Sequence, residues 1–219
     1  MKDHIFISDF DGTITIKDFY WIVIDDYIGE KGRGHYYKWK KKEKIGLTFL
    51  NKIFAWHSFT QAEHDEILSK VSIDPTFKNF DTWVQNHKWD IMVLSAGFRY
   101  YIDHAMDLEA LSHIPIITNE GSFVDGHFKM QANEKSWFYH KIYGVDKQKV
   151  VLHYKKKYKK VYFAGDSEPD YKAALAADIR FAKGELLELL ETGGHTYYPF
   201  EIFADIIDIL ELLEEPNSN

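Results

Sequence analysis

Two aspartates stand two residues apart in the run Asp9-Phe10-Asp11-Gly12-Thr13, directly after the apolar residues 5–8. A strand would send both carboxylates to the same side, and two close carboxylates repel each other unless a cation lies between them. A few hard oxygen ligands suit Mg²⁺, which takes a substrate phosphate as a further ligand. The run therefore predicts a magnesium and phosphate site, with a pair of turn-forming aspartates as the alternative.

A second polar group, residues 165–170 with the sequence GDSEPD, follows the apolar residues 161–164 in the same way. Asp166 can complete the oxygen ligands of the metal. Asp170 lies four residues further on and can support the site from the first turn of a helix, so we include both among the metal-site candidates. Alone, this group would be an ordinary strand-to-helix turn with an N-cap. Paired with Asp9 and Asp11, it favours a metal site.

A third group, Ser95-Ala96-Gly97, follows the apolar residues 91–94. A hydroxyl, small residues and a helix N-terminus together form a ready anion site. The alternative is that Ser95 is only an N-cap. Arg99 comes just after this group and could add a contact to an anion.

Acidic groups around one metal would repel a phosphate dianion, so the site also needs a fixed cation. Lys147, which stands 19 residues before Asp166, is our candidate for that cation. Spacing alone does not exclude its neighbours Lys141 and Lys149, and by composition any of the three could be a surface lysine.

The elements that must hold these residues are four short apolar runs, residues 5–8, 91–94, 161–164 and 179–182. Continuous apolar runs separated by helical patterns are typical of parallel strands buried on both faces. In open parallel sheets, ligands bind beyond the carboxyl ends of the strands. We therefore predict an α/β fold with the polar groups gathered at one edge of a parallel sheet.

The long segment from residue 16 to 74 has helical spacing with glycine breaks, and it is longer than a crossover helix requires. It predicts a small helical cap over a core made of residues 1–15 and 75–219. Its aromatic residues fit packing within the cap better than a substrate platform; they are Tyr20, Trp21, Tyr36, Tyr37 and Trp39. Residues 77–87, 98–111 and 199–215 read as further helices. Alternation around Asp125-Gly126 indicates a hairpin.

Composition sets limits on these interpretations. The 219 residues are 45% hydrophobic, carry a formal net charge of −7 and include no cysteine, which excludes disulfides, thiolate metal sites and cysteine nucleophiles. The acidity argues weakly against nucleic acid as a partner, and the basic runs 38–44 and 155–160 read as solvated helix faces. No stretch reaches the ~18 apolar residues of a membrane span, and the first residues do not form a signal peptide. We expect a soluble, cytoplasmic monomer or homodimer that binds neither nucleic acid nor membrane.

The motifs Asp9–Thr13, hydrophobic-Ser95, Lys147 and Gly165-Asp166-x-x-x-Asp170 resemble, in order, the four motifs of the haloacid dehalogenase (HAD)-like hydrolase superfamily. The resemblance implies a Rossmann-like parallel sheet, and the insertion is similar to the helical C1-type cap of the phosphoserine-phosphatase-like branch. Within that branch the chain looks most like the methionine-salvage phosphatases acting on 2-hydroxy-3-keto-5-methylthiopentenyl-1-phosphate. The shared features are DFDGTIT followed by Asp18, the hairpin after the second motif, and the distance of Lys147 from GDS.

The resemblance and the residue chemistry imply the same mechanism. Asp9 attacks phosphorus and forms an aspartyl-phosphate. Asp11 protonates the leaving alkoxide and then takes a proton from the hydrolytic water. Magnesium is held by Asp9, the main-chain carbonyl of Asp11 and Asp166, with Asp170 close by.

The substrate of such an enzyme is a small phosphorylated metabolite. The phosphoserine phosphatases that the chain resembles place a substrate-facing acid at the position of Asp18, although an aspartate at a helix N-terminus is the simpler interpretation. The implied phosphate-binding residues are Gly12, Thr13, Ser95, Ala96, Gly97 and Lys147.

Two features depart from the resemblance. Ala96 replaces the glycine usual after this serine, which could tighten the phosphate loop, and the cysteine-rich stretch of the methionine-salvage relatives is missing. Asp11 favours a phosphatase or phosphomutase over pump-type phosphotransfer and over dehalogenation. The alternatives are therefore a phosphoserine phosphatase, a phosphoryl transferase or phosphomutase of the same fold, and a non-catalytic binding module.

Overall fold

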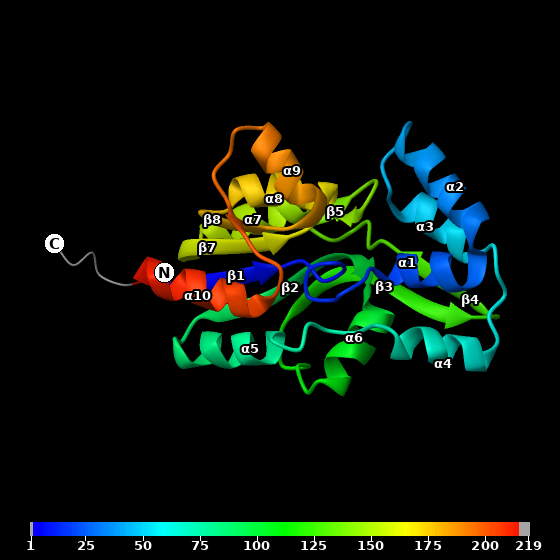
Figure 1. The fold of residues 1–219 in the computed structure, drawn as a ribbon, viewed down its shortest axis with the longest axis horizontal. Coiled ribbons are helices and arrows are strands. Elements are labelled where there is room, and N and C mark those ends of the chain that lie inside the picture. Colours follow the sequence, from blue (N-terminus) through cyan, green and yellow to red (C-terminus); the bar gives the residue numbers. More distant parts are fainter. Residues whose placement is uncertain (1, 215–219) are drawn as a thin grey trace.

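The computed structural model describes residues 2–214 as a seven-stranded sheet between two layers of helices (Figure 1). The strand order is β4-β3-β2-β1-β7-β8-β9, and every neighbouring pair is parallel except the hairpin pair β3 and β4. The strands are β1 (Lys2–Ser8), β2 (Asp90–Phe98), β3 (Ile116–Val124), β4 (His127–Gln131), β7 (Tyr158–Gly165), β8 (Ile179–Ala182) and β9 (Tyr198–Pro199). A separate two-stranded ladder joins β5 (Tyr139–His140) to β6 (Gly144–Val145).

The four apolar runs of the sequence lie in β1, β2, β7 and β8, which confirms the parallel α/β sheet. Strand β1 is central, and its Ile7 pairs with Met92 on one side and Phe163 on the other. Strand β2 continues beyond its apolar run to Phe98, with a shift of register against β3 after Leu94. Ser95 is therefore part of the strand and is not the N-cap that its position suggested.

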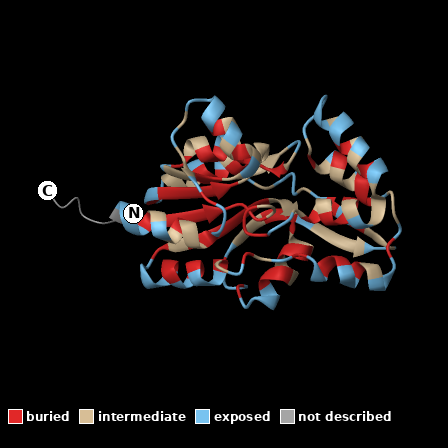
Figure 2. Ribbon diagram, viewed as in Figure 1, coloured by how far each residue is buried: buried red, intermediate tan, exposed pale blue. Residues whose placement is uncertain are grey.

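Helices cover both faces of the sheet (Figure 1). One face carries α5 (Phe77–Asn86), α6 (Arg99–Leu108) and α10 (Phe203–Glu214); the other carries α7 (Lys147–Lys155), α8 (Tyr171–Ala176) and α9 (Gly184–Thr192). Side chains alternate along a strand, so Phe6 packs into the first layer and its neighbours Ile5 and Ile7 into the second. Figure 2 shows the resulting buried centre, with exposed residues on the outer sides of the helices.

The predicted helices 77–87 and 98–111 correspond to α5 and α6. The predicted helix 199–215 begins later, at Phe203, because Tyr198 and Pro199 pair with β8 as a short edge strand. Residue 215, the end of that prediction, lies outside the described residues.

Residues 16–74 contain the helices α1 (Phe19–Val23), α2 (Glu30–Lys40), α3 (Leu47–Phe54) and α4 (Gln61–Ser69), with a π-helical turn at Ile24–Ile28. The two ends of this segment meet, since Thr15 and Ile73 form an isolated antiparallel bridge and the Asp74 N–H donates to the Ile14 carbonyl at 2.8 Å. The chain thus leaves and re-enters the sheet region at one place. The division into a core and a cap at these boundaries stays a prediction.

The predicted hairpin is present as β3 and β4. Its turn residues Asp125 and Gly126 have φ values of 52° and 73°, as the tight turns of two-residue hairpins require. Phe128 on β4 is 1% exposed, and its ring lies 5.1 Å from that of Phe19 and 5.3 Å from that of Phe59. The hairpin therefore fastens the inserted helices to the sheet through an aromatic cluster.

We expect Phe128→Ala to lower the free energy of unfolding by about 3–5 kcal/mol, because it leaves a cavity in this cluster. Lys129→Ala, next to it on the exposed face of β4, should change the stability by less than about 0.5 kcal/mol. Urea unfolding of both variants measures the difference. Equal stability of the two would show that the hairpin does not hold the helices in place.

Candidate active site

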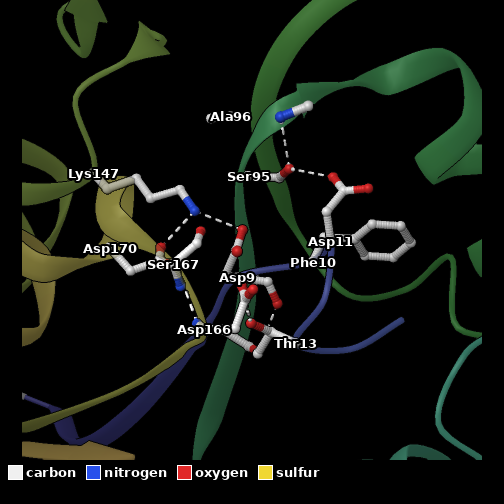
Figure 3. Close-up of polar contacts among 12 residues, drawn as sticks. Asp9, Phe10, Asp11, Thr13, Ser95, Ala96, Lys147, Asp166, Ser167 and Asp170 are labelled. Atoms are coloured by element: carbon white, nitrogen blue, oxygen red, sulfur yellow. Dashed lines mark hydrogen bonds and ion pairs between the residues drawn. The ribbon is translucent and has the colours of Figure 1, made fainter. Parts of the chain in front are cut away.

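The site lies at the carboxyl ends of the central strands, where the polar groups of the sequence come together (Figure 3). Asp9 directly follows β1, Ser95 lies near the end of β2, and Asp166 directly follows β7. Lys147 is the first residue of α7, whose N-cap Asp146 accepts a hydrogen bond from the Lys149 N–H at 2.9 Å. This cap fixes the start of α7, and with it the place of Lys147.

Lys147 is buried, and its Nζ donates to Oδ1 of Asp9 and to Oδ1 of Asp170, both at 2.6 Å. Burial alone would lower the pKa of Lys147, but the charges of Asp170 and Asp9 outweigh it and raise that pKa above its usual value. The ammonium therefore stays charged. Of the three candidate lysines the structure brings Lys147 to the site, and neither Lys141 nor Lys149 lines the cavity there.

Asp170 ties this lysine to the turn that carries Asp166. While Oδ1 binds Lys147, Oδ2 accepts the main-chain N–H groups of Asp166 and Ser167, each at 3.2 Å. A short 3₁₀ turn at Glu168–Asp170 leads into α8 and sets this geometry. Both oxygens of Asp170 are thus engaged, so its main contribution is to position Asp166 and Lys147.

The acidic residues form a group with the composition of a magnesium site. Carboxylate oxygens of Asp9, Asp166 and Asp170 lie within 4.8 Å of one another. Burial first, and then the charges of neighbouring aspartates, raise the pKa of Asp9 and of Asp166 well above the usual range. Thr13 Oγ1 donates to Asp166 Oδ1 at 3.0 Å. Oxygen-only donors with this excess of negative charge suit a hard divalent cation.

Asp11 points away from this group and is held by three donors. Its Oδ1 accepts the Phe19 N–H at 3.1 Å, and its Oδ2 accepts the Tyr101 hydroxyl in a short hydrogen bond and the Ser95 hydroxyl at 3.4 Å. Burial raises the pKa of Asp11 above its usual value, although the hydrogen bonds from Tyr101 and Phe19 oppose the shift. A fixed carboxyl group with a raised pKa is suited to proton transfer.

Glycine is required at two positions of the site because other side chains lie too close to the main chain there for a Cβ atom to fit. Gly12 has a φ of +70°, and a Cβ there would lie 2.6 Å from Asp166 Oδ2. A Cβ on Gly97 would collide with the Tyr101 hydroxyl, and the Gly97 N–H donates to Ser95 Oγ at 2.8 Å. Larger residues at either position would displace the acidic groups.

Asp18 and Arg99 differ in where they lie. Asp18 lines the cavity, and burial followed by the charge of Asp11 raises its pKa to about 7. Arg99 instead donates to Asp103 Oδ1 at 3.3 Å and to the Ile116 carbonyl at 3.1 Å, and it does not line the cavity. The structure therefore brings Asp18 to the site and turns Arg99 away from it.

Two residues of the site carried no signal in the sequence. One is Tyr101, which lies on α6 and binds Asp11. The other is Asn119 on β3, 2% exposed, whose Nδ2 donates to the carbonyls of Ala96, Gly97 and Tyr143 at 2.9–3.1 Å. Asn119 thus joins the phosphate loop to the segment before α7. Both contacts depend on pairs of residues distant in the sequence.

A cavity of about 380 Å³ opens above these residues. Its floor includes Asp9, Asp11, Ser95 and Lys147. Its walls come from α1, α2, α3, β4 and α9. The inserted helices thus lie over the reactive groups. Among residues 2–214, no helix is long and apolar enough to cross a membrane.

Comparisons with known proteins agree with this geometry. No protein-family model matches the chain. It is 27% identical to Pdp3-interacting factor 1 of Schizosaccharomyces pombe, with 94% of each chain covered. It is 26% identical to polyol phosphate phosphatase PYP1 of Saccharomyces cerevisiae, covering 94% of this chain and 92% of the relative. It is 25% identical to 2-hydroxy-3-keto-5-methylthiopentenyl-1-phosphate phosphatase of Lysinibacillus sphaericus, covering 99% and 97%.

Solved structures share the fold at low sequence identity. A phosphoserine phosphatase holding an analogue of its phospho-aspartyl intermediate has a TM-score of 0.68 at 12% identity, with 97% of this chain and 99% of that one covered. A HAD family hydrolase from Salmonella enterica serovar Typhi has a TM-score of 0.73 at 12% identity, covering 99% and 73%. The chain therefore has the same fold as these two structures. Two of the named relatives with nearly full coverage are phosphatases.

We expect Asn119→Ala to lower both stability and turnover, because the carbonyls of Ala96, Gly97 and Tyr143 lose the side-chain donor that joins them. The loss of stability should be about 1–3 kcal/mol. Glu120→Ala, the exposed neighbour on β3, is the control. Thermal unfolding and phosphate release from p-nitrophenyl phosphate measure both effects. If turnover per folded molecule were the same in both variants, Asn119 would act on stability alone.

The raised pKa values predict how magnesium and pH act on stability. An aspartate whose pKa is higher in the folded protein binds more protons there than when unfolded, so stability falls as pH rises through that window. For the metal-free protein, the window runs from the usual value of about 4 to at least the pKa of about 7 of Asp18, with Asp9 and Asp166 also raised.

Magnesium replaces those protons, so we expect it to raise Tm by a few degrees more at about pH 8 than at about pH 5.5. Thermal unfolding in Mg²⁺ and in chelator measures this difference. Asp166→Asn should lose most of the increment, and Asp208→Asn, exposed on α10, should keep it. An equal increment at both pH values would contradict the assignment of the acidic group.

Proposed function

We propose that the chain is a magnesium-dependent phosphomonoesterase that hydrolyses a small metabolite phosphate through an aspartyl-phosphate on Asp9. The observation that carries this proposal is the pairing of two different carboxyl groups at the end of β1. Asp9 lies against the Lys147 ammonium at 2.6 Å, whereas Asp11 is held by Tyr101, Phe19 and Ser95. Asp9 thus lies beside a positive charge, whereas Asp11 is held in a position from which it can give and take a proton.

In the first step, an oxygen of Asp9 forms a bond to phosphorus while the bond from phosphorus to the ester oxygen breaks. Asp11 gives its proton to the departing alkoxide. In the second step, water attacks phosphorus and gives a proton to Asp11, which releases inorganic phosphate and restores the Asp9 carboxylate. Each aspartate thus ends the cycle in the state in which it began.

The remaining groups hold the phosphoryl oxygens. Lys147, the Ser95 hydroxyl and main-chain N–H groups of the loops at Gly12 and Gly97 are the donors. Asp9, Asp166 and the main-chain carbonyl of Asp11 would hold magnesium, with Asp170 positioning Asp166. When bound, the ion offsets negative charge on the phosphoryl oxygens.

Two named relatives support a small phosphomonoester as substrate, since one is a polyol phosphate phosphatase and the other acts on 2-hydroxy-3-keto-5-methylthiopentenyl-1-phosphate. The second compound is our first candidate. Phosphoserine and a phosphomutase reaction are the alternatives, and a screen for phosphate release over metabolite phosphates distinguishes them. We further propose that the enzyme works in the cytoplasm as a monomer or homodimer, without nucleic acid or membrane.

We expect Asp9→Asn and Asp11→Asn to fail in different ways. Asp9→Asn removes the attacking anion, so it should abolish turnover and form no covalent adduct. Asp11→Asn removes the proton donor, which is typically worth about 10²–10⁴-fold. The aryloxide of an aryl phosphate leaves without needing a proton. The rate of the first step in Asp11→Asn should therefore fall less on p-nitrophenyl phosphate than on an alkyl phosphate.

Slow hydrolysis in Asp11→Asn should let aspartyl-phosphate accumulate, visible as a gain of ~80 Da on the peptide containing Asp9. Rapid-quench kinetics on both esters and mass spectrometry are the measurements, with exposed Asp208→Asn as the control. Equal losses on both esters, with no trapped adduct, would rule out this division of roles.

A further inference from the structure

We propose that the substrate's leaving group is uncharged and ends in an apolar group, so that esters carrying a carboxylate or a second phosphate there are poor substrates. This inference rests on the phosphatase function proposed above. It concerns the walls of the 380 Å³ cavity, beyond the catalytic residues of its floor.

Apolar side chains form much of the wall that faces the catalytic floor. They come from segments far apart in the sequence, and Phe54, Phe98 and Met130 among them are at most 5% exposed. Leu50 on α3 and Leu189 on α9 are half-buried parts of the same wall. Such a surface is favourable for an apolar group and costly for a charged one, which would lose its water there.

Every lysine among the described residues that line the cavity already binds a carboxylate of the protein. Lys147 is held by Asp9 and Asp170. Lys40 pairs with Glu185 at 2.8 Å, and Lys44 pairs with Glu168 at 2.7 Å.

The pair of Lys40 and Glu185 joins the end of α2 to the start of α9. The pair of Lys44 and Glu168 joins the segment after α2 to the turn before α8. Glu168 is fixed further by a short hydrogen bond from the Tyr143 hydroxyl. A substrate carboxylate would have to share its lysine with Glu185 or Glu168, whose negative charge offsets part of the attraction.

The other titratable carboxyl groups of the wall repel anions when they are ionised. Asp18 and Glu43 also line the cavity, and both are acidic. Arg99 does not compensate for them, because its guanidinium binds Asp103 and the Ile116 carbonyl outside the cavity. Uncharged hydroxyl groups remain acceptable near the ester, since Asp18, Tyr20 and Tyr36 offer polar atoms there. Phosphoserine and sugar bisphosphates fit this wall poorly.

Three esters of equal chain length test the proposal: pentyl phosphate, 5-hydroxypentyl phosphate and 5-phosphooxypentanoate. They differ only in a terminal methyl, hydroxyl or carboxylate group. We expect the carboxylate ester to have a kcat/KM at least about tenfold below that of pentyl phosphate, with the hydroxyl ester between them. p-Nitrophenyl phosphate is assayed alongside as a substrate without such a chain.

Two variants place an arginine on α3, one in the wall and one outside it. Leu50→Arg puts a free cation into the apolar wall, so it should raise kcat/KM for the carboxylate ester relative to pentyl phosphate by about tenfold. Thr48→Arg adds the same charge at an exposed position that does not line the cavity, and it should leave that ratio unchanged. Comparing the two variants separates a local contact between the new arginine and the substrate carboxylate from a general effect of added positive charge.

The outcomes distinguish this inference from the proposed function. Equal kcat/KM for the methyl and carboxylate esters, or a preference for the carboxylate, would overturn the inference while leaving a phosphatase. No phosphate release from any ester, p-nitrophenyl phosphate included, would overturn the proposed function itself. If Leu50→Arg failed to fold, the three esters on the unmodified enzyme would still decide the question.

Discussion

The buried ammonium of Lys147 is the interaction on which the rest of the site depends. It lies between Asp9 and Asp170, and all three side chains are at most 5% exposed. Removing charges from water is costly unless they are paired in good geometry. With Asp166 included and all three carboxyl groups ionised, three negative charges meet one ammonium, which leaves two negative charges in excess. A divalent cation matches that excess, and the site then meets a phosphate dianion without net repulsion.

Hydrogen bonds from the surrounding structure fix the positions of these charged side chains relative to one another. Asp170 links the lysine to the turn after β7, and Lys183 Nζ donates to the Thr13 carbonyl at 3.0 Å, bracing the loop after β1. Asn119 connects the end of β2 with the segment before α7. Each link joins the ends of different strands or helices. A rigid parallel sheet supplies the fixed positions that these short hydrogen bonds need.

The sequence predicted the sheet and its carboxyl edge because buried parallel strands are continuous apolar runs, and because functional groups follow them directly. It predicted the hairpin because Asp125-Gly126 suits a tight turn. It did not predict Tyr101 or Asn119, since their roles arise only when α6 and β3 pack beside the site. For the same reason, Arg99 looked available next to Ser95, whereas the fold directs its guanidinium toward Asp103. Where β2 ends was also missed, because pairing with β3 extends the strand past its apolar run.

The difference between residues that the sequence predicts and residues that only the fold brings together bears on which substrate the site accepts. The catalytic floor comes from short motifs at strand ends, where one or two neighbouring residues fix the chemistry. The walls combine α1, α2, α3, β4 and α9, so a change in any of them alters what fits without touching Asp9 or Asp11. Two relatives with nearly full coverage and similar identity to this chain are named for different substrates, a polyol phosphate and a methylthiopentenyl phosphate. Specificity within this fold therefore has to be argued from the charge and polarity of the walls. Here each lysine that lines the cavity, among residues 2–214, is already paired with a carboxylate of the protein.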